Sequence, residues 1–209
     1  VNLLYQALTR HDEQQAGELI LRMHTSFDLY TLFGRVFVPT LVKIGEGWYR
    51  GELSVSTEHF ASAYLRGKLL TLLQAYPIRR SAAQILVGCG PDEQHEIGSL
   101  MLAVLLRSNG FRVEYLGPDI PLDDLVEYVA DERPNMVILS ATTENTARQL
   151  NNFQARLNRL RHPVIFGFGG GAFSTNKALR REIAGEFLGE TLDESLNTTR
   201  ELLSGKMAG

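Results

Sequence analysis

The spacing of hydrophobic residues divides the chain near residue 80. Over residues 1–77 apolar side chains recur every three or four positions, as on amphipathic helices, and no stretch alternates as a strand would. Asp12 with Gln15 three positions later resembles a helix-capping pair. Pro39 should kink or restart a helix, and a long helix follows over about 54–76. We therefore predict about four helices that form a small bundle.

After residue 82 short apolar runs alternate with segments of helical spacing. Four runs have the composition of strands and a fifth, near the C-terminal helix, is possible: 85–87, 112–116, 136–139, 164–166 and 186–188. Strands that alternate with helices in this way are typical of a doubly wound parallel sheet. The predicted fold class is α/β, with a helical domain over residues 1–77 and a sheet domain over residues 82–209. Ligands of such sheets bind beyond the carboxyl ends of the strands.

Composition is ordinary for a globular chain, with 44% hydrophobic and 22% charged residues. The net charge of -3 provides no basic field for a phosphate backbone, so we expect any DNA-reading part to lie outside this chain. No apolar run approaches the ~20 residues that span a bilayer, so no membrane partner is expected. The N-terminus lacks the pattern of a signal peptide. Cys89 is the only cysteine, which excludes an internal disulfide and makes a cytoplasmic location the default expectation.

The loop after the first predicted strand carries a candidate metal ligand. His95 comes just before the next helix, at the ligand side of the sheet, and Glu93 lies two positions earlier. A neutral imidazole can bind a metal through one ring nitrogen and donate its other N–H to a carboxylate. One histidine is weak evidence for a metal site, so a solvated loop residue or a helix cap is the alternative interpretation.

Two later loops at the same edge of the sheet carry weaker signals. Ser140 and Thr142 follow the third strand and offer hydroxyl groups to a ligand, although strand ends often carry such residues without a function. After the fourth strand, Gly169 and Gly170 would let a ligand approach the backbone closely. The glycine run fits neither GxGxxG nor a P-loop. On the residues alone it indicates a ligand or a tight turn.

The helical half contains a second unusual group. Glu58 lies on the apolar stripe of the long helix, His59 is adjacent, and Trp48 ends the preceding helix. A carboxylate on such a stripe must find a partner or turn toward solvent. Taken one at a time, Trp48 would be a core residue, Glu58 the frayed edge of the stripe and His59 a surface residue. Together they would give a ligand a flat apolar wall with hydrogen-bonding groups.

As a set, these residues resemble the cobalamin-binding, light-sensing region of MerR-type transcriptional regulators. One shared motif is a tryptophan followed, after nine residues, by Glu-His, and the other is Glu/Asp-x-His-x-x-Gly. In this chain the motifs are Trp48 with Glu58 and His59, and Glu93 with His95 and Gly98. The later Ser-x-Thr and the glycine pair also fit. The resemblance covers nearly the whole chain.

The resemblance implies a four-helix bundle above a Rossmann-like, flavodoxin-type cobalamin domain. His95 would be the lower axial ligand of cobalt in place of the cofactor's own base, and Glu93 would orient it. The displaced nucleotide tail would run beside the residues of the two later loops, which are Ser140, Thr142, Gly169 and Gly170. Trp48, Glu58 and His59 would cap the upper axial group, which the family implies is 5′-deoxyadenosyl.

The implied function is that of a sensor rather than an enzyme. Adenosylcobalamin and its photolysis would control a homo-oligomer, a dimer or a tetramer. DNA would be bound only through a domain that is not in this chain or through a partner protein. The best-matching regulators often carry, directly after the motif tryptophan, a histidine that takes the upper cobalt position after light. Tyr49 stands there in this chain, so the light response is left open.

Two other functions compete with the sensor. A corrinoid methyl carrier of a methyltransferase system shares the lower-ligand motif and is of similar length. Such carriers generally have Asp in place of Glu93 and lack the set formed by Trp48, Glu58 and His59. A third, weaker interpretation is a flavodoxin-like protein with another cofactor, for which the fold offers only analogy.

Overall fold

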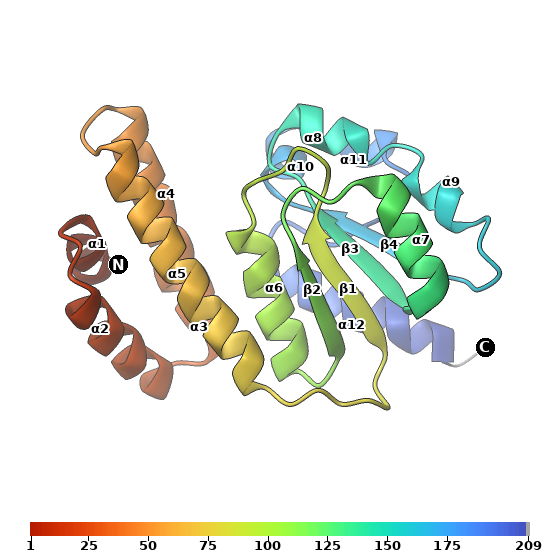
Figure 1. Cartoon of the computed structure of the whole chain (residues 1–209), viewed down its shortest axis with the longest axis horizontal. Helices are drawn as coiled ribbons and strands as arrows, with labels where there is room; N and C mark the ends of the chain where they lie inside the picture. Colours follow the sequence, from red (N-terminus) through yellow and green to blue (C-terminus); the bar gives the residue numbers. More distant parts are fainter. Residues whose placement is uncertain (208–209) are drawn as a thin grey trace. The chain divides into compact units, whose positions relative to one another are not determined.

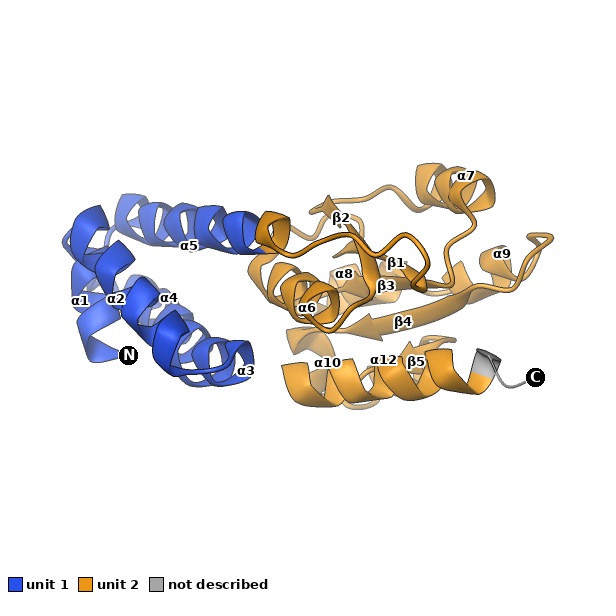
Figure 2. Cartoon of the chain, turned by 90° about the horizontal axis from the view of Figure 1, so that it is seen from below, with its two compact units in different colours: residues 1–72 blue, residues 73–209 orange. Residues whose placement is uncertain are grey.

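The computed structural model describes residues 1–207, which form two compact units (Figures 1 and 2). The first unit is Val1–Leu72 and the second begins at Leu73. Helices in the first unit and a parallel sheet in the second confirm the predicted α/β class. None of the helices in the described part of the chain is long and apolar enough to cross a membrane.

The first unit contains helices alone among its described residues. Asp12 begins one of them as predicted, because its side chain accepts the N–H of Gln15 at 2.9 Å. Leu8, Leu32 and Phe37 are fully buried in this unit. Its helices are α1 (Asn2–Thr9), α2 (Glu13–Ser26), α3 (Leu29–Leu32), the π-helical η1 (Phe33–Phe37), α4 (Val38–Tyr49) and α5 (Val55–Ala75).

Pro39 changes the type of helix rather than ending it. The chain remains helical from α3 through η1 into α4, and the N–H of Val38 donates to the carbonyl oxygen of Phe33, five residues earlier. Proline removes a hydrogen bond and its ring clashes with the carbonyl four residues before it in a regular α-helix. The wider π turn directly before Pro39 accommodates both effects. The expected kink or restart is therefore replaced by a π-helical segment.

The second unit is built on one five-stranded sheet with the order β2-β1-β3-β4-β5, and every neighbouring pair is parallel. Its strands are β1 (Gln84–Cys89), β2 (Arg112–Gly117), β3 (Met136–Ser140), β4 (Ile165–Gly169) and β5 (Glu186–Phe187). The chain enters at β1 and then builds outward in both directions. The loops after β1 and β3 therefore meet where the strand order reverses, which is where ligands of this fold class bind.

Helices cover both faces of this sheet, with α6 and α12 on one face and α7 on the other (Figures 1 and 2). They are α6 (Ile97–Ser108), α7 (Leu122–Glu132), α8 (Glu144–Gln149), α9 (Phe153–Leu157), α10 (Gly171–Thr175), α11 (Leu179–Glu182) and α12 (Leu192–Met207). A core rich in phenylalanine fills one face, and the ring centroids of Phe153 and Phe166 lie 5.0 Å apart. The sheet thus positions the loops at its carboxyl edge rigidly.

Two elements of this unit differ from the sequence prediction. The segment of helical spacing between the third and fourth predicted strands forms two short helices, α8 and α9, separated where Asn152 adopts the left-handed conformation with φ 65°. The fourth strand is longer than expected and continues to Gly169. At Gly167 a Cβ atom would lie 2.6 Å from Met136 Cε, so glycine here makes room for the neighbouring strand's side chain. Part of the glycine run is therefore strand.

Candidate functional site

A buried carboxylate organises the loop between β1 and α6. The side chain of Glu93 is only 1% exposed. Its Oε1 accepts the backbone N–H of His95 at 2.9 Å and lies 2.7 Å from His95 Nδ1. Just before it, Asp92 has a left-handed backbone with φ 58°, and its N–H donates to Asp119 Oδ1 at 2.8 Å. The loop therefore turns back on itself and places the carboxylate beneath the imidazole.

The second oxygen of Glu93 is held by the segment that follows β3. Glu93 Oε2 accepts the backbone N–H of Thr142, the Thr142 hydroxyl at 2.7 Å and the Thr146 hydroxyl at 3.1 Å. Burial raises the pKa of Glu93, but the hydrogen bonds from His95 and Thr142 outweigh it and hold the pKa below its usual value. The carboxylate is therefore ionised at neutral pH, and both of its oxygens accept hydrogen bonds.

His95 is oriented by this carboxylate and faces outward. A carboxylate can only accept, so Nδ1 carries a proton, and in the neutral ring Nε2 carries the free lone pair. The His95 side chain is 74% exposed, and Nδ1 also lies 3.1 Å from Thr142 Oγ1. Nε2 has no hydrogen-bond partner in the described part of the chain. This is the arrangement that a metal-binding histidine requires.

Polar side chains below the loop fix the start of α6. The Tyr115 hydroxyl, on β2, donates to Glu96 Oε2 at 2.7 Å, and the Ser99 hydroxyl donates to the Glu96 carbonyl at 2.8 Å. Cys89 Sγ lies 3.2 Å from Ser99 Oγ. Burial raises the pKa of the Cys89 thiol to about 12, so it stays protonated and is not the thiolate that a metal would need. The loop is thus held from both sides.

Three glycines lie at this edge of the sheet, and neighbouring atoms exclude a side chain at one of them. A Cβ atom on Gly170, whose φ is 108°, would lie 2.3 Å from the Ala141 carbonyl oxygen and 2.9 Å from Ser140 Oγ. On Gly169 or Gly98 the same atom would meet nothing within 4 Å. Gly170 is therefore required by packing, whereas Gly98 and Gly169 leave open space beside the loop that carries the imidazole.

The residues predicted at the carboxyl edge form two neighbouring groups. Glu93, His95 and Thr142 share one hydrogen-bonded cluster, and Ser140 pairs with Gly169 in the β3–β4 register. Thr142 was expected beside a ligand tail, but its hydroxyl is occupied by the Glu93 carboxylate. The Ser140 hydroxyl, by contrast, has no protein partner among the described residues. The Ser140 hydroxyl is therefore available to a ligand as a donor, and the Thr142 hydroxyl proton is taken by Glu93.

Sequence reasoning missed the contribution of Thr146. It lies in the first turn of α8, where its side chain and that of Thr143 form a reciprocal cap, and the same hydroxyl reaches Glu93. Two threonines spaced three residues apart are typical of the start of a helix. This capping role accounts for Thr146 in the sequence, so the pattern does not indicate its additional hydrogen bond to Glu93. Tyr115 and Ser99 were missed because each lies on a segment that the apolar pattern explains fully.

The helical unit places the other three predicted residues around the end of α4 and the start of α5. Trp48 is 49% exposed, so the interpretation as a core residue is wrong. Glu58 finds its partners on its own helix, since Oε2 lies 2.6 Å from His59 Nδ1 and Oε1 accepts the Ser62 hydroxyl at 2.6 Å. Glu58 and His59 thus form a pair, and Trp48 presents an apolar surface in the same unit.

The donor set suits a metal that brings most of its own ligands. No group of three or more His, Cys, Asp and Glu side chains among residues 1–207 could hold a metal ion. His95 offers a single oriented nitrogen that faces outward, and a Cβ atom on Gly98 would meet nothing within 4 Å. These residues fit a metal that carries its own macrocycle and would take one histidine nitrogen from the protein.

Comparison with known families identifies both halves of the chain. A B12 binding domain family matches residues 83–194, and a second B12 binding domain family matches residues 1–73. The chain is 32% identical over 182 residues to the HTH-type transcriptional repressor CarH of Myxococcus xanthus, a match that covers 85% of this chain and 60% of that protein. A match to the repressor CarA covers 31% of that protein. The chain thus spans less than two thirds of either repressor.

Corrinoid proteins match over almost the full length of the chain. The trimethylamine corrinoid protein of Methanosarcina barkeri is 23% identical over 206 residues, which are 95% of this chain and 94% of that protein. The structure of the monomethylamine corrinoid protein from the same organism superimposes with a TM-score of 0.78 at 18% identity, over 95% of this chain and 96% of that one. This likeness supports the fold.

The two adjacent glycines provide a matched test of the site's backbone. We expect Gly170→Ala to lower the free energy of unfolding by about 2 kcal/mol or more, because the new Cβ atom meets the Ala141 backbone at an unfavourable φ. Gly169→Ala should change it by no more than about 0.5 kcal/mol. Urea unfolding followed by circular dichroism measures both. Equal losses in the two variants would contradict the backbone constraint.

Proposed function

The chain belongs to the B12 binding domain family, and on that premise we propose that it is the adenosylcobalamin-binding sensor module of a transcriptional regulator. The observation that carries this proposal is the outward-facing Nε2 of His95, whose ring is held by the buried Glu93. A binding and signalling role needs no catalytic group, and the proposal assigns none to this chain.

On the lower face of the cofactor we assign His95 as the axial ligand of cobalt. Glu93 orients the ring, and by accepting the hydrogen bond from Nδ1–H it raises the basicity of Nε2. The nucleotide tail would pass the free Ser140 hydroxyl and the open backbone at Gly98 and Gly169. Gly170 keeps the neighbouring loop close to β3, and Thr142 holds the carboxylate.

On the upper face we assign a cap to the helical unit. Trp48 would cover the apolar part of the adenosyl group, and the Glu58–His59 pair would bind its sugar hydroxyls. The bound cofactor supplies a cobalt–carbon bond that visible light breaks. Tyr49 is 87% exposed and offers a phenol where the resembling regulators often have histidine. The position after Trp48 would therefore offer no histidine to the metal.

Signalling would proceed through assembly. A ligand shifts a conformational equilibrium only by its differential affinity for the two states, so the adenosyl group must contact a surface that differs between them. We propose that the cap provides this surface and that its contact with the adenosyl group stabilises a homo-oligomer. DNA would then be bound through a domain outside this chain or through a partner protein, as the likeness to HTH-type repressors suggests.

A corrinoid methyl carrier is the second candidate. The corrinoid proteins of Methanosarcina match nearly the whole chain, which favours this function. The higher identity to a repressor, and the presence of Trp48 with Glu58 and His59, favour the sensor. A carrier must expose the upper cobalt face to a methyltransferase, whereas a sensor covers it. The upper face therefore discriminates between the two functions.

The lower ligand is tested by His95→Ala. We expect cobalamin affinity to fall at least about tenfold, because the metal loses its only protein ligand. In the reduced Co(II) form, electron paramagnetic resonance of the wild type should show nitrogen superhyperfine splitting that changes when the protein is labelled with ¹⁵N-histidine. His24→Ala, on α2, is the matched control and should keep this signature. A labelled wild type with an unchanged spectrum would exclude His95 as ligand.

The sensor is separated from the carrier by size in the dark and after light. We expect the protein loaded with adenosylcobalamin in darkness to elute from gel filtration as an oligomer, and to become smaller after green light. The protein loaded with methylcobalamin serves as the control. A carrier would accept the methyl form at least as well and keep one size throughout, and that result would reject the sensor.

The cap is tested by Trp48→Ala. Loss of the indole should weaken binding of adenosylcobalamin by roughly tenfold, since a large apolar contact is removed, while methylcobalamin affinity should change little. Tyr49→Ala, which removes the neighbouring exposed aromatic ring, is the control. Titration followed by absorbance measures both affinities. If the variant distinguishes the two forms as well as the wild type does, Trp48 does not belong to the cap.

A further inference from the structure

Five arginines surround the turn between α6 and β2, at the opposite end of the strands from His95. Arg79 lies over this turn, with its guanidinium 3.3 Å from the Cβ position of Gly110, and Arg200 donates to the side-chain oxygen of Asn109. Arg80, Arg107 and Arg112 line a pocket beside it. We call this group the arginine corner. Its members are Arg79, Arg80, Arg107, Arg112 and Arg200.

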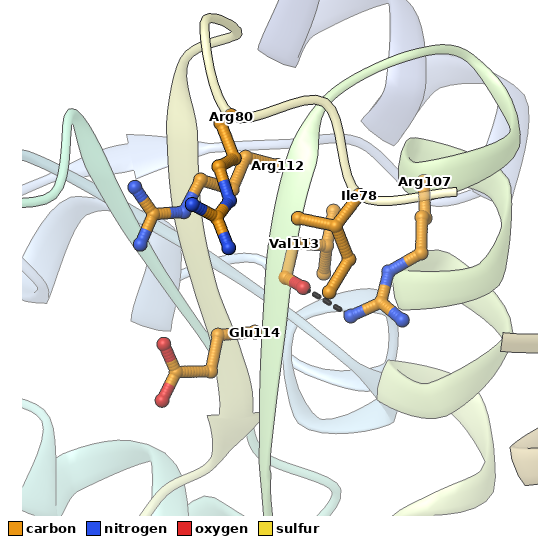
Figure 3. A pocket seen from close by; sticks show the side chains of 6 residues that line it. All are labelled: Ile78, Arg80, Arg107, Arg112, Val113 and Glu114. Atoms are coloured by element: carbon orange, nitrogen blue, oxygen red, sulfur yellow. Dashed lines mark hydrogen bonds between the residues drawn. The ribbon is translucent and has the colours of Figure 1, made fainter. Parts of the chain in front are cut away.

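The pocket of the arginine corner is open and about 510 Å³ in volume. Figure 3 shows Arg80 and Arg112 on one side of β2 with Glu114, and Arg107 on the other side. Ile78 and Val113 complete the lining, so the pocket combines cationic and apolar surface. Its volume falls within the range of roughly 300–1,000 Å³ that is usual for small-molecule sites.

The arginines of the corner outnumber the carboxylates around them, and Glu114 is the acidic residue of the pocket lining. Within residues 1–207 none of its five arginines forms an ion pair, whereas Arg148, Arg156 and Arg180 each contact a carboxylate. The Oε1 atom of Glu114 already accepts the Tyr128 hydroxyl. Guanidinium groups that share a pocket repel one another unless an anion lies between them.

Arg107 has a structural role that sets it apart from the others. It lies in the last turn of α6, where a cation offsets the negative end of the helix dipole. Its guanidinium donates to the carbonyl oxygens of Leu73 and Val113. Its Nε is shielded from solvent and has no partner among the described residues. Arg107 is therefore fixed as one wall of the pocket, and Arg80 and Arg112 keep their donors free.

We propose that Arg80 and Arg112 bind a phosphate group of a second ligand in this pocket. Guanidinium groups present parallel N–H donors that match two oxygens of a phosphate, and such charge-assisted pairs are the stronger hydrogen bonds of proteins. Ile78, which is 58% exposed, would contact the apolar part of the same ligand. The net charge of -3 for the whole chain conceals this local concentration of positive charge.

This pocket is distinct from the cobalamin site. Arg112 begins β2 and Arg80 precedes β1, so both lie at the amino edge of the sheet, whereas His95 follows the carboxyl end of β1. A strand of six residues separates the two edges by roughly 20 Å. The phosphate of a cobalamin held on His95 therefore belongs to the other edge.

Two sources can supply the phosphate, a small phosphorylated molecule or the backbone of a nucleic acid. A second pocket, about 440 Å³ in volume and lined by Arg133, Arg159 and Arg161, lies near the amino ends of β3 and β4. A nucleic acid could reach both pockets, whereas a nucleotide would fill one. The two sources therefore differ in the size of the probe that binds best.

The test uses the cobalamin-loaded protein with pyrophosphate, ADP and a short DNA duplex as probes in isothermal titration calorimetry at low salt. We expect pyrophosphate to bind, and Arg80→Gln with Arg112→Gln to weaken it by about 100-fold, roughly tenfold for each charge-assisted contact. Arg80→Lys with Arg112→Lys keeps the charge but not the forked donors, so an intermediate loss is expected. Arg181→Gln, an exposed arginine of α11, is the matched control and should bind as the wild type does.

The outcomes separate the alternatives. Tighter binding of ADP than of the duplex assigns a small phosphorylated ligand, and the reverse assigns a nucleic-acid backbone. No binding of any probe to the wild type, or an equal loss in the Arg181 variant, overturns the proposal. The cobalamin absorbance spectrum reports the other site independently, and thermal unfolding reports whether each variant is folded.

Discussion

The burial of one negative charge determines the geometry of the loop that carries His95. A carboxylate away from water is costly unless its oxygens are fully hydrogen-bonded, and Glu93 meets this requirement with donors from two distant segments. His95 supplies its backbone N–H and its ring, while Thr142 and Thr146 supply the rest. Movement of the loop that carries His95 would leave the charge unsatisfied. The protein's own hydrogen bonds thus fix the direction of the imidazole.

The parallel sheet is what brings these donors together. Glu93 follows β1 and Thr142 follows β3, and 49 residues separate them in the chain. The two strands are neighbours because the chain reverses its direction of strand addition after β2. A simple sequential order would have placed another loop beside Glu93. The site therefore depends on topology as much as on the identity of its residues.

The strands and the contact between Glu93 and His95 could be predicted from the sequence, and the features that could not have physical causes. Periodicity located the strands, and the two-residue spacing between Glu93 and His95 indicated their contact, because both lie in one short loop. The contact of Thr146 was not readable, since it depends on the orientation of a helix that begins in another loop. Trp48 fits the apolar stripe of its helix, yet that helix ends one residue later and leaves the indole half exposed.

The net charge of the chain does not show where its charged residues lie. The small net charge argued against phosphate binding, but a sum over 209 residues carries no information on position. In a parallel sheet, the loops that lead into the strands lie at the amino edge and the loops that leave them lie at the carboxyl edge. Here the carboxyl edge holds Asp92, Glu93 and Asp119, and the amino edge holds the arginine corner. Opposite charges at opposite edges cancel in the total, so each edge has to be assessed separately. Because α6 begins two residues after His95 and contains Arg107 in its last turn, the two edges are also the two ends of one helix.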